Sequence, residues 1–216
     1  MKSQLNELLE EVRAAYEKSK IGKKHEWFYS LITTPCIKYS PLIVGFNWGV
    51  DRNFQHRPQV HIKESYIKNE DLGSLARIEQ YYWKEYLPLE AFHRASQTNY
   101  CFFRSEKAAQ IDNDDLLLCQ PIFDKLLKIL EPSIVLSFSS KLRDYLLHSG
   151  QVTDLESKCL EYTRGKTKVP YTPYKGKLSF GAPIVFLPHP NYPLKKEIRV
   201  KSWQFCFPKI KKEHEI

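Results

Sequence analysis

Four short runs with the composition of buried β-strands restrict the fold of this chain more than any other feature. The clearest is Leu42–Val44, which follows Pro41 and ends at Gly45. The other three lie within Ser96–Phe103, Ile134–Phe138 and Ala182–Leu187. Apolar runs bounded by turn residues, without strict polar alternation, are typical of strands that are covered on both faces. The sequence therefore predicts a sheet that is buried inside the protein.

Segments with apolar residues at helical spacing alternate with these runs. We predict helices at Leu5–Tyr16, Trp27–Ile32, Leu72–Tyr86, Asp114–Leu130, from Ser139 to His148, and at Lys195–Phe205. We predict loops at Lys18–Lys24 and Asp51–Lys63, and a loop with one helical piece at Val152–Lys177. Because helices and strands alternate, we expect an α/β fold, a three-layer α/β/α sandwich around a mainly parallel four-stranded sheet. The aromatic residues of Leu72–Tyr86 could stack on nucleobases, but at helical spacing they are more often core.

The composition is that of a globular protein with an excess of basic residues. The chain has 216 residues, of which 42% are hydrophobic, and it carries a net charge of +8. A single domain over residues 1–216 fits this length. The basic residues gather in Lys18–Lys24, Arg164–Lys177 and Lys195–Lys212. Such clusters fit either contact with a polyanion or solvated surface lysines, and charge alone leaves both interpretations open.

The chain lacks the sequence features of membrane, secreted and metal-binding proteins. No apolar run approaches the ~20 residues of a membrane-spanning helix, and the N-terminal segment has no signal-peptide core. The five cysteines are scattered without a C-x-x-C pair, and the seven histidines form no metal-binding pattern. We therefore expect a cytoplasmic monomer with reduced thiols and with no metal or cofactor.

Three polar side chains lie in or directly after predicted strands. Asn47 follows the first strand between two glycines, Asn99 interrupts the second, and His189 follows the last between two prolines. Because ligands bind beyond the carboxyl ends of strands in open α/β sheets, these side chains are candidates for chemistry. Each also has a purely structural interpretation, as a turn-forming asparagine, a buried amide that bridges backbone segments, and a loop histidine.

Three stretches around these residues occur in the order of known motifs. They are Gly45-Phe46-Asn47-Trp48-Gly49, Asn99-Tyr100-Cys101-Phe102 and His189-Pro190-Asn191. In this order and strand context, the chain resembles the uracil-DNA glycosylase superfamily and, within it, the single-strand-selective monofunctional branch. The resemblance implies the fold expected above and DNA as the partner. It also implies an enzyme of base excision repair that flips a base out of DNA and hydrolyses its N-glycosidic bond.

The resemblance also assigns roles to individual residues. Asn47 would hold the attacking water against the sugar, and His189 would donate a hydrogen bond to the departing base. Asn99 would read the edge of the base, because one amide supplies both a donor and an acceptor. The other base-binding candidates are Gly45, Phe46, Trp48 and a stacking ring, for which Phe54 is the nearest phenylalanine and His61 lies nearer the expected distance.

The loop after His189 would contact DNA. Leu194 is the candidate wedge that fills the gap left by the flipped nucleotide, and a leucine packed in the core is the alternative for this position. Asn191, Lys195 and Lys196 are the other candidates for contact with the strand. No lysine occurs in the motifs, so a Schiff base between enzyme and sugar is not indicated.

Two residues depart from the family pattern. Trp48 stands where the first motif has proline, and Asn191 stands where the second has serine. The tryptophan could itself stack on a base. These departures concern the identity of the base, which could be uracil, another modified pyrimidine or a purine lesion. They also leave open a protein that binds nucleic acid without catalysis. A nucleotide enzyme acting on small molecules is a third alternative, which no phosphate-binding glycine motif supports.

Overall fold

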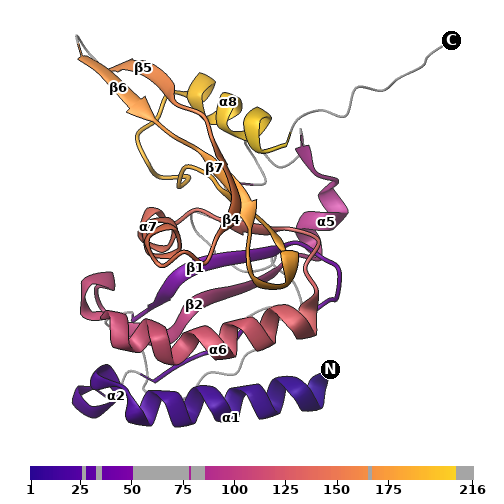
Figure 1. Ribbon diagram of the computed structural model, residues 1–216, viewed down its shortest axis with the longest axis vertical. Helices are drawn as coiled ribbons and strands as arrows, with labels where there is room; N and C mark the ends of the chain where they lie inside the picture. Colours follow the sequence, from indigo (N-terminus) through magenta and orange to yellow (C-terminus); the bar gives the residue numbers. More distant parts are fainter. Residues whose placement is uncertain (26–27, 33–35, 51–77, 79–85, 165–166, 208–216) are drawn as a thin grey trace, which may run out of the picture.

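The computed structural model describes residues 1–25, 28–32, 36–50, 78, 86–164 and 167–207, which form an α/β architecture (Figure 1). Within these residues the main sheet has six strands in the order β2-β1-β3-β8-β7-β4. The parallel strands are β1 (Leu42–Gly49), β2 (Ser96–Ser105), β3 (Val135–Ser137) and β8 (Pro183–Phe186). Two antiparallel strands, β7 (Tyr174–Lys177) and β4 (Thr153–Ser157), extend the sheet beyond β8.

The order of the parallel strands creates a crevice at one edge of the sheet. After β1 the chain crosses to one side to form β2, and after β2 it crosses to the other side of β1 to form β3 and then β8. The connections that follow β1 and β3 therefore leave in opposite directions. In open α/β sheets, ligands bind at such a topological switch point, outside the carboxyl ends of the strands.

Helices cover both faces of the sheet. They are α1 (Lys2–Lys18), α5 (Leu89–His93), α6 (Asn113–Leu130), α7 (Ser140–His148) and α8 (Lys196–Cys206). Leu42 and Val44 of β1 belong to the core that contains residues of α1, α6 and α7, whereas Ile43 between them belongs to the core that contains residues of α5 and α8. The alternation follows from the pleat of the strand, and the arrangement fits the predicted three-layer sandwich.

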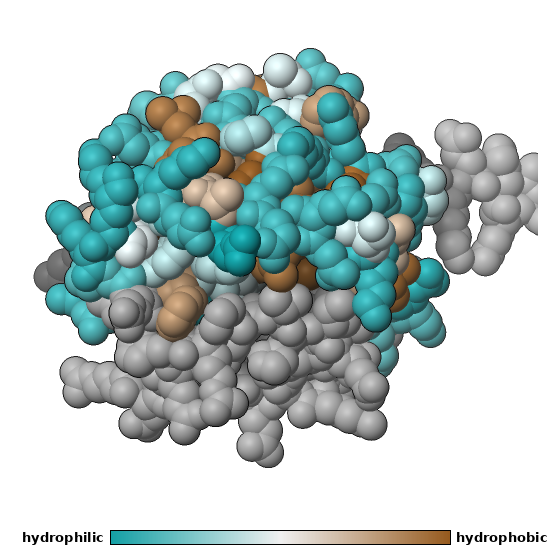
Figure 2. Space-filling view, turned by 90° about the horizontal axis from the view of Figure 1, so that it is seen from below, coloured by the Kyte–Doolittle hydropathy of each residue, from teal (hydrophilic) through white to brown (hydrophobic). Residues whose placement is uncertain are grey.

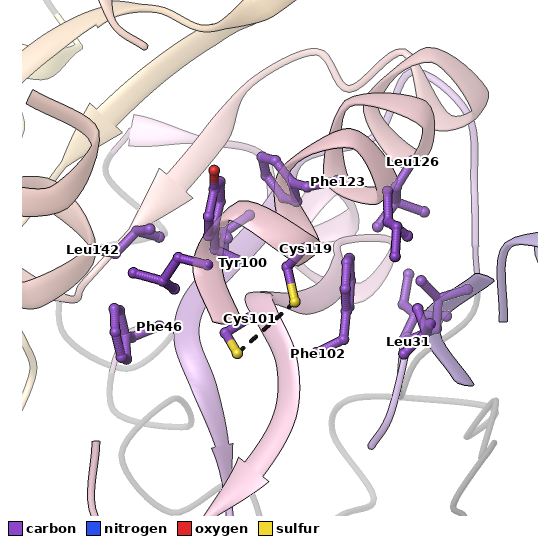
Figure 3. Packing of buried hydrophobic residues seen from close by; sticks show 14 of the residues in the cluster. Leu31, Phe46, Tyr100, Cys101, Phe102, Cys119, Phe123, Leu126 and Leu142 are labelled. Carbon is purple, nitrogen blue, oxygen red and sulfur yellow. Dashed lines mark hydrogen bonds between the residues drawn. The ribbon is translucent and has the colours of Figure 1, made fainter. Parts of the chain in front are cut away.

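The strand β2 is buried along most of its length against α6 (Figure 3). The ring of Tyr100 packs on Phe123 with the ring centroids 5.0 Å apart. The sulfur of Cys101 lies 3.9 Å from that of Cys119, and burial raises the pKa of the Cys101 thiol well above its ordinary value. All five cysteines of the chain are free thiols. The strand that carries Asn99 is therefore anchored in the largest core.

The segment between α7 and β8 differs from the prediction. We predict a loop with one helical piece for Val152–Lys177, but the segment contains β4, β7 and a separate antiparallel hairpin of β5 (Leu160–Arg164) and β6 (Thr167–Tyr171). The sheet therefore has six strands instead of the expected four, because β7 and β4 pair beyond β8. Because every described residue of β4 is exposed, this strand has no apolar pattern by which its sequence could reveal it.

Two predictions near the N-terminus are also wrong. Lys20–Lys24 forms the short helix α2 instead of a loop, because the Ser19 side chain caps its first turn. Residues 28–32 form no helix, and Tyr29 and Ile32 form single β-bridges with β2. The predicted loop Asp51–Lys63 and most of the predicted helix Leu72–Tyr86 lie outside the described residues.

The outer surface of α1 faces solvent. Leu8 and Val12 are buried against the core, whereas Glu10 and Arg13 are exposed and form an ion pair of 2.9 Å on the other side of the helix. Most of the coloured residues on the face seen from below, on which α1 lies, are hydrophilic (Figure 2). In the part of the chain that the structure describes, no helix is both long enough and apolar enough to cross a membrane.

Candidate active site

A pocket of about 370 Å³ lies at the topological switch point, and we refer to it as the strand-end pocket. All four parallel strands contribute to its wall: β3 and β8 through residues after their carboxyl ends, and β1 and β2 through residues within the strands, among them Asn47 and Asn99. Five predicted site residues from three separate stretches of the sequence line it together: Gly45, Phe46, Asn47, Asn99 and His189. Its volume lies within the roughly 300–1,000 Å³ that is usual for small-molecule sites. The structure therefore assembles the predicted residues around one cavity.

Asn99 lies opposite Gly45 in the parallel pairing of β2 with β1. Its side chain occupies the space above the glycine, where a Cβ would overlap the Asn99 Oδ1 and lie 3.2 Å from its Cγ. Asn99 is 6% exposed, and the described residues supply no hydrogen-bond partner for its amide. Because buried amides are normally hydrogen-bonded, this side chain is available to pair with a ligand in the pocket.

The amide of Asn47 is held in one orientation. Its Nδ2 donates to the Trp48 carbonyl at 2.8 Å and to the Ser105 Oγ at 2.7 Å. The carbonyl can only accept, and the Ser105 hydroxyl uses its own proton to donate to the Lys107 carbonyl at 2.9 Å. The nitrogen of the amide must therefore occupy this position, which leaves Oδ1 as the Asn47 atom that can accept a hydrogen bond from a ligand or a water.

The ring of His189 has an equally defined state. Its Nδ1 accepts a hydrogen bond of 3.1 Å from the Asn191 backbone N–H. An N–H can only donate, so the neutral ring carries its proton on Nε2 and presents it as a donor. Partial burial of the ring, together with the nearby charge of Arg199, lowers the pKa of His189 below its ordinary value. Near neutral pH the imidazole is therefore uncharged.

A buried arginine fixes the loop that carries His189. Arg199 of α8 is 8% exposed, and its guanidinium donates to the His189 carbonyl at 2.9 Å, to the Leu194 carbonyl at 3.4 Å and to the Tyr192 carbonyl. One side chain thus binds three backbone carbonyls of one loop, because the planar guanidinium has several donors. We refer to these three contacts as the Arg199 clamp. The position of the His189 backbone depends on the docking of α8.

Lys141, the second residue of α7, also lines the strand-end pocket. Its Nζ hydrogen-bonds to the Ala108 carbonyl and lies 4.2 Å from the centroid of the Phe46 ring. Partial burial lowers the pKa of this lysine. The Phe46 ring therefore lines the pocket and also forms a cation–π contact with the Lys141 ammonium group. A lysine beside the predicted site residues matters for the mechanism, because a lysine can act as a nucleophile.

Trp48, predicted to bind the base, does not line the strand-end pocket. The pairing of β1 with β2 shifts register between Asn47 and Trp48, and the ring lies 9% exposed in the protein interior. Its indole N–H donates to the Ser30 carbonyl at 2.5 Å, and the Arg104 guanidinium lies 5.9 Å from the ring centroid. A register shift re-aims the side chains that follow it, and here the tryptophan becomes part of the core.

Leu194, predicted as a wedge, is 9% exposed and packs in a small hydrophobic cluster with Ile198 and two residues of the β5–β6 hairpin. This position corresponds to the alternative of a leucine in the core, because α8 needs an apolar contact at its start. Lys195 and Lys196 are exposed at the beginning of α8. Asn191 is exposed, and its backbone holds the His189 ring. Phe54 and His61 lie outside the described residues.

Sequence reasoning missed three residues that define the site: Ser105, Lys141 and Arg199. Lys141 follows the third predicted strand by a few residues, so its proximity to the strand end is a signal that could have identified it. Arg199 lies between the apolar residues Ile198 and Val200, but this pattern alone does not indicate that the arginine is buried. Ser105 carries no signal, because its role depends on the pairing of β1 with β2.

Comparison with models of known protein families finds no match for this chain, and comparison with curated protein sequences finds none either. Within the described residues, no three His, Cys, Asp or Glu side chains gather as the ligands of a metal ion would.

Proposed function

We propose that this protein is a monofunctional DNA glycosylase, which flips a damaged or modified base out of DNA and hydrolyses its N-glycosidic bond. The observation that carries this proposal is the convergence of Asn47, Asn99 and His189 on the strand-end pocket. Together they offer an acceptor for a water, an amide for recognition and a neutral donor. The proposal also agrees with the motif order in the sequence and with the basic character of the chain.

Recognition of the flipped base falls to Asn99. A pyrimidine such as uracil presents an acceptor at O4 and a donor at N3–H, and one amide group can satisfy both. The free amide of Asn99 stands over Gly45, so the glycine provides the space in which this amide lies. A base that could not form both hydrogen bonds would leave part of the buried amide unpaired. The free-energy cost of this unpaired group disfavours such a base and so makes the pocket selective.

Attack by water falls to Asn47. Cleavage of the glycosidic bond develops positive charge on the sugar, and a well-placed neutral water can then add to it. The free Oδ1 of Asn47 can accept a hydrogen bond from this water and so direct the water's lone pair towards the sugar. An amide is not a base, and the contribution of Asn47 is therefore positioning, which can lower a barrier substantially.

Stabilisation of the departing base falls to His189. Negative charge develops on the base oxygen as the bond breaks, and the Nε2–H of the neutral imidazole can donate to that oxygen. The Asn191 N–H and the Arg199 guanidinium preorganise the ring and its loop, so little reorganisation accompanies the reaction.

The test is base release from end-labelled oligonucleotides that contain uracil, 5-hydroxymethyluracil, hypoxanthine or xanthine, single- and double-stranded, followed by alkali. We expect strand cleavage at one or more of these lesions. His189→Ala should lower the rate about 10²–10³-fold, as loss of one transition-state donor does elsewhere. Asn47→Ala should lower it as well, and gel-shift affinity for DNA should persist in both variants. The matched controls are His93→Ala and Asn6→Ala, whose side chains are exposed outside the pocket.

Unchanged base release in both pocket variants would contradict the assigned roles. Lys141 adds a second readout, because a pocket lysine could in principle attack the sugar and form an imine. Its hydrogen bond to Ala108 and its contact with Phe46 support a charged, structural lysine. We therefore expect no covalent adduct upon borohydride treatment of an active reaction, and an adduct that Lys141→Gln abolishes would contradict the monofunctional assignment.

A nucleic-acid-binding protein without catalysis is the second candidate. The observation that favours it is that no Asp or Glu lines the strand-end pocket among the described residues, so the pocket offers no carboxylate as general base. This candidate predicts salt-sensitive DNA binding and intact strands with all four lesions. Release of any of the four bases excludes it.

A further inference from the structure

A second pocket, of about 350 Å³, adjoins the strand-end pocket, and we refer to it as the side pocket. The two pockets share the wall formed by Phe138, Ser139, Ser140 and His189. The opposite wall of the side pocket comes from the end of β6, the start of β7 and the loop after His189. A ligand that fills the strand-end pocket therefore lies directly beside the side pocket.

The side pocket favours an anion. Arg143 of α7 lines it with a side chain that is 23% exposed, and His189 lines it too, whereas no carboxylate does so among the described residues. The Nε and Nη2 of Arg143 pair with Asp144 at 2.8 Å and 2.7 Å. Its Nη1 has no partner in the described part of the chain. A guanidinium with a free donor, already held in place, is suited to a phosphate oxygen.

The side pocket also favours a planar ring. Three tyrosines line it, one from each element of its outer wall: Tyr171, Tyr174 and Tyr192. The Arg143 guanidinium lies 5.4 Å from the centroid of the Tyr174 ring, which orients both groups. The ring of Tyr192 is 50% exposed, although its backbone is held by the Arg199 clamp. Proteins stack nucleobases on exposed aromatic rings that lie beside a cation.

We propose that the side pocket binds a second nucleotide of the same DNA strand, next to the one whose base enters the strand-end pocket. Its phosphate would bind Arg143, and its unpaired base would stack on the tyrosines, with Tyr192 as the outermost ring. The combination of one free guanidinium donor, aromatic rings and no carboxylate selects an anionic aromatic ligand, and the shared wall selects the adjacent nucleotide. The identity of the strand as DNA rests on the function proposed above.

The test is isothermal titration of the full-length protein with thymidine 5′-monophosphate, with thymidine and with inorganic phosphate. We expect the nucleotide to bind at least tenfold more tightly than either part alone. Arg143→Gln should weaken nucleotide binding about tenfold or more, because a charge-assisted hydrogen bond is lost. Tyr192→Ala should weaken nucleotide binding and leave phosphate binding unchanged. This exposed side chain can be removed without disturbing the fold, so it complements the partly buried Arg143.

Two control variants separate the pockets. Asn99→Ala removes the amide of the strand-end pocket and should leave the Arg143-dependent binding intact. Arg13→Gln removes an exposed arginine on α1, far in sequence from either pocket, and should have no effect. The proposal is overturned if the wild type binds no nucleotide at millimolar concentration, if Arg143→Gln binds as the wild type does, or if binding is lost in Asn99→Ala alone.

The two proposals can fail separately. A protein that binds thymidine monophosphate through Arg143 but releases no base from any oligonucleotide contradicts the glycosylase proposal and supports the side pocket. A protein that releases base at the same rate and with the same KM in the wild type, Arg143→Gln and Tyr192→Ala supports the glycosylase and contradicts the side pocket. If both proposals hold, the two variants should raise the KM for a single-stranded oligonucleotide and leave kcat largely unchanged.

Discussion

Asn47 and His189 are each held by a backbone group that permits only one orientation of the side chain. The Trp48 carbonyl accepts from the Asn47 Nδ2, and the Asn191 N–H donates to the His189 Nδ1. These contacts use the Asn47 Nδ2 and the His189 Nδ1, and they leave the Asn47 Oδ1 and the His189 Nε2 for a ligand. At the scale of single residues, the polarity of the strand-end pocket is therefore fixed before any substrate binds.

Gly45 is the residue whose substitution tests this pocket most directly. In Gly45→Ala the new methyl group would overlap the Asn99 Oδ1, so we expect the amide to be displaced and base release to fall at least tenfold. Overpacking of this kind also costs about 1–3 kcal/mol of stability. Thermal unfolding and the oligonucleotide assay measure the two effects. Gly49→Ala is the matched control, since a Cβ there meets nothing within 4 Å. Equal activity of the two variants would contradict the role of Gly45.

The protonation of His189 predicts the pH dependence of activity. The pKa of this histidine lies below the ordinary 6.5, so base release should rise as the pH rises through that lowered pKa and should be level near neutrality. Protonation would displace the Asn191 N–H and place a charge beside Arg199. In Arg199→Gln the pKa should move back towards 6.5 without reaching it, because burial is the larger cause of the shift.

NMR titration of the imidazole nitrogens measures this pKa in the absence of DNA. Lys196→Gln serves as the control, because it removes an exposed charge from the same helix without removing the clamp on the loop. A His189 pKa at or above 6.5 in the wild type would contradict the assigned neutral state.

At the scale of elements, α6 begins with a reciprocal cap. The Asp112 side chain accepts from the Asp115 N–H at 3.0 Å, and the Asp115 carboxylate accepts from the Asp112 N–H at 3.2 Å. The bond from the Asp115 N–H is the main cause that lowers the pKa of Asp112. Burial has the opposite effect on Asp115 and raises its pKa. The pKa values of the two carboxyl groups of the cap are therefore shifted in opposite directions, and Asp115 is protonated at a higher pH than Asp112.

Removal of this cap should destabilise the protein moderately. We expect Asp112→Ala to cost about 0.5–2 kcal/mol in the free energy of unfolding at neutral pH, measured by urea denaturation. Because the folded-state pKa of Asp112 lies below 3.8, its contribution is present above that pH and is lost as the pH falls through the lowered value. Asp112→Asn keeps an acceptor oxygen and should cost less. A larger loss in Asp112→Asn than in Asp112→Ala would contradict the capping role.

The sequence predicts the elements whose signal is local. All four parallel strands and the helices α1, α6, α7 and α8 are present, because burial on both faces and helical spacing leave clear patterns. The predicted end of the first strand at Val44 is wrong, since β1 continues to Gly49 and Asn47 lies within the strand instead of on a turn after it. The strands β4 and β7 escape prediction since their place depends on the free edge of β8, which is not a local property. The motifs likewise select Asn47, Asn99 and His189, which the structure brings together around the strand-end pocket. The interior position of Trp48 depends on a register shift that no motif records.

At the scale of the whole molecule, the net charge of +8 predicts salt-dependent binding to DNA. The logarithm of the binding constant should fall linearly with the logarithm of salt concentration, with a slope of about −0.7 per phosphate contacted on a single strand. Lys195 and Lys196 lie exposed beside the loop of His189. Replacement of both by glutamine should reduce the magnitude of the slope by about 0.7 per lysine and weaken binding to all sequences equally.

Fluorescence anisotropy with a labelled oligonucleotide measures this slope. The matched control is Lys2→Gln with Lys125→Gln, which removes the same charge from α1 and α6 on the other layer. If both double variants change the slope equally, the binding reflects overall charge and not a surface beside the His189 loop.

Because of the Arg199 clamp, the proposed activity should depend on the docking of α8, although this helix is distant in sequence from the first motif. A shortened chain that ended before α8 would keep Asn47, Asn99 and His189, yet it would lack the side chain that gathers the carbonyls around His189. Local undocking of α8 on heating would have the same effect while the central sheet remained folded. Under the proposed function, base release would then be lost at a lower temperature than that at which the sheet melts.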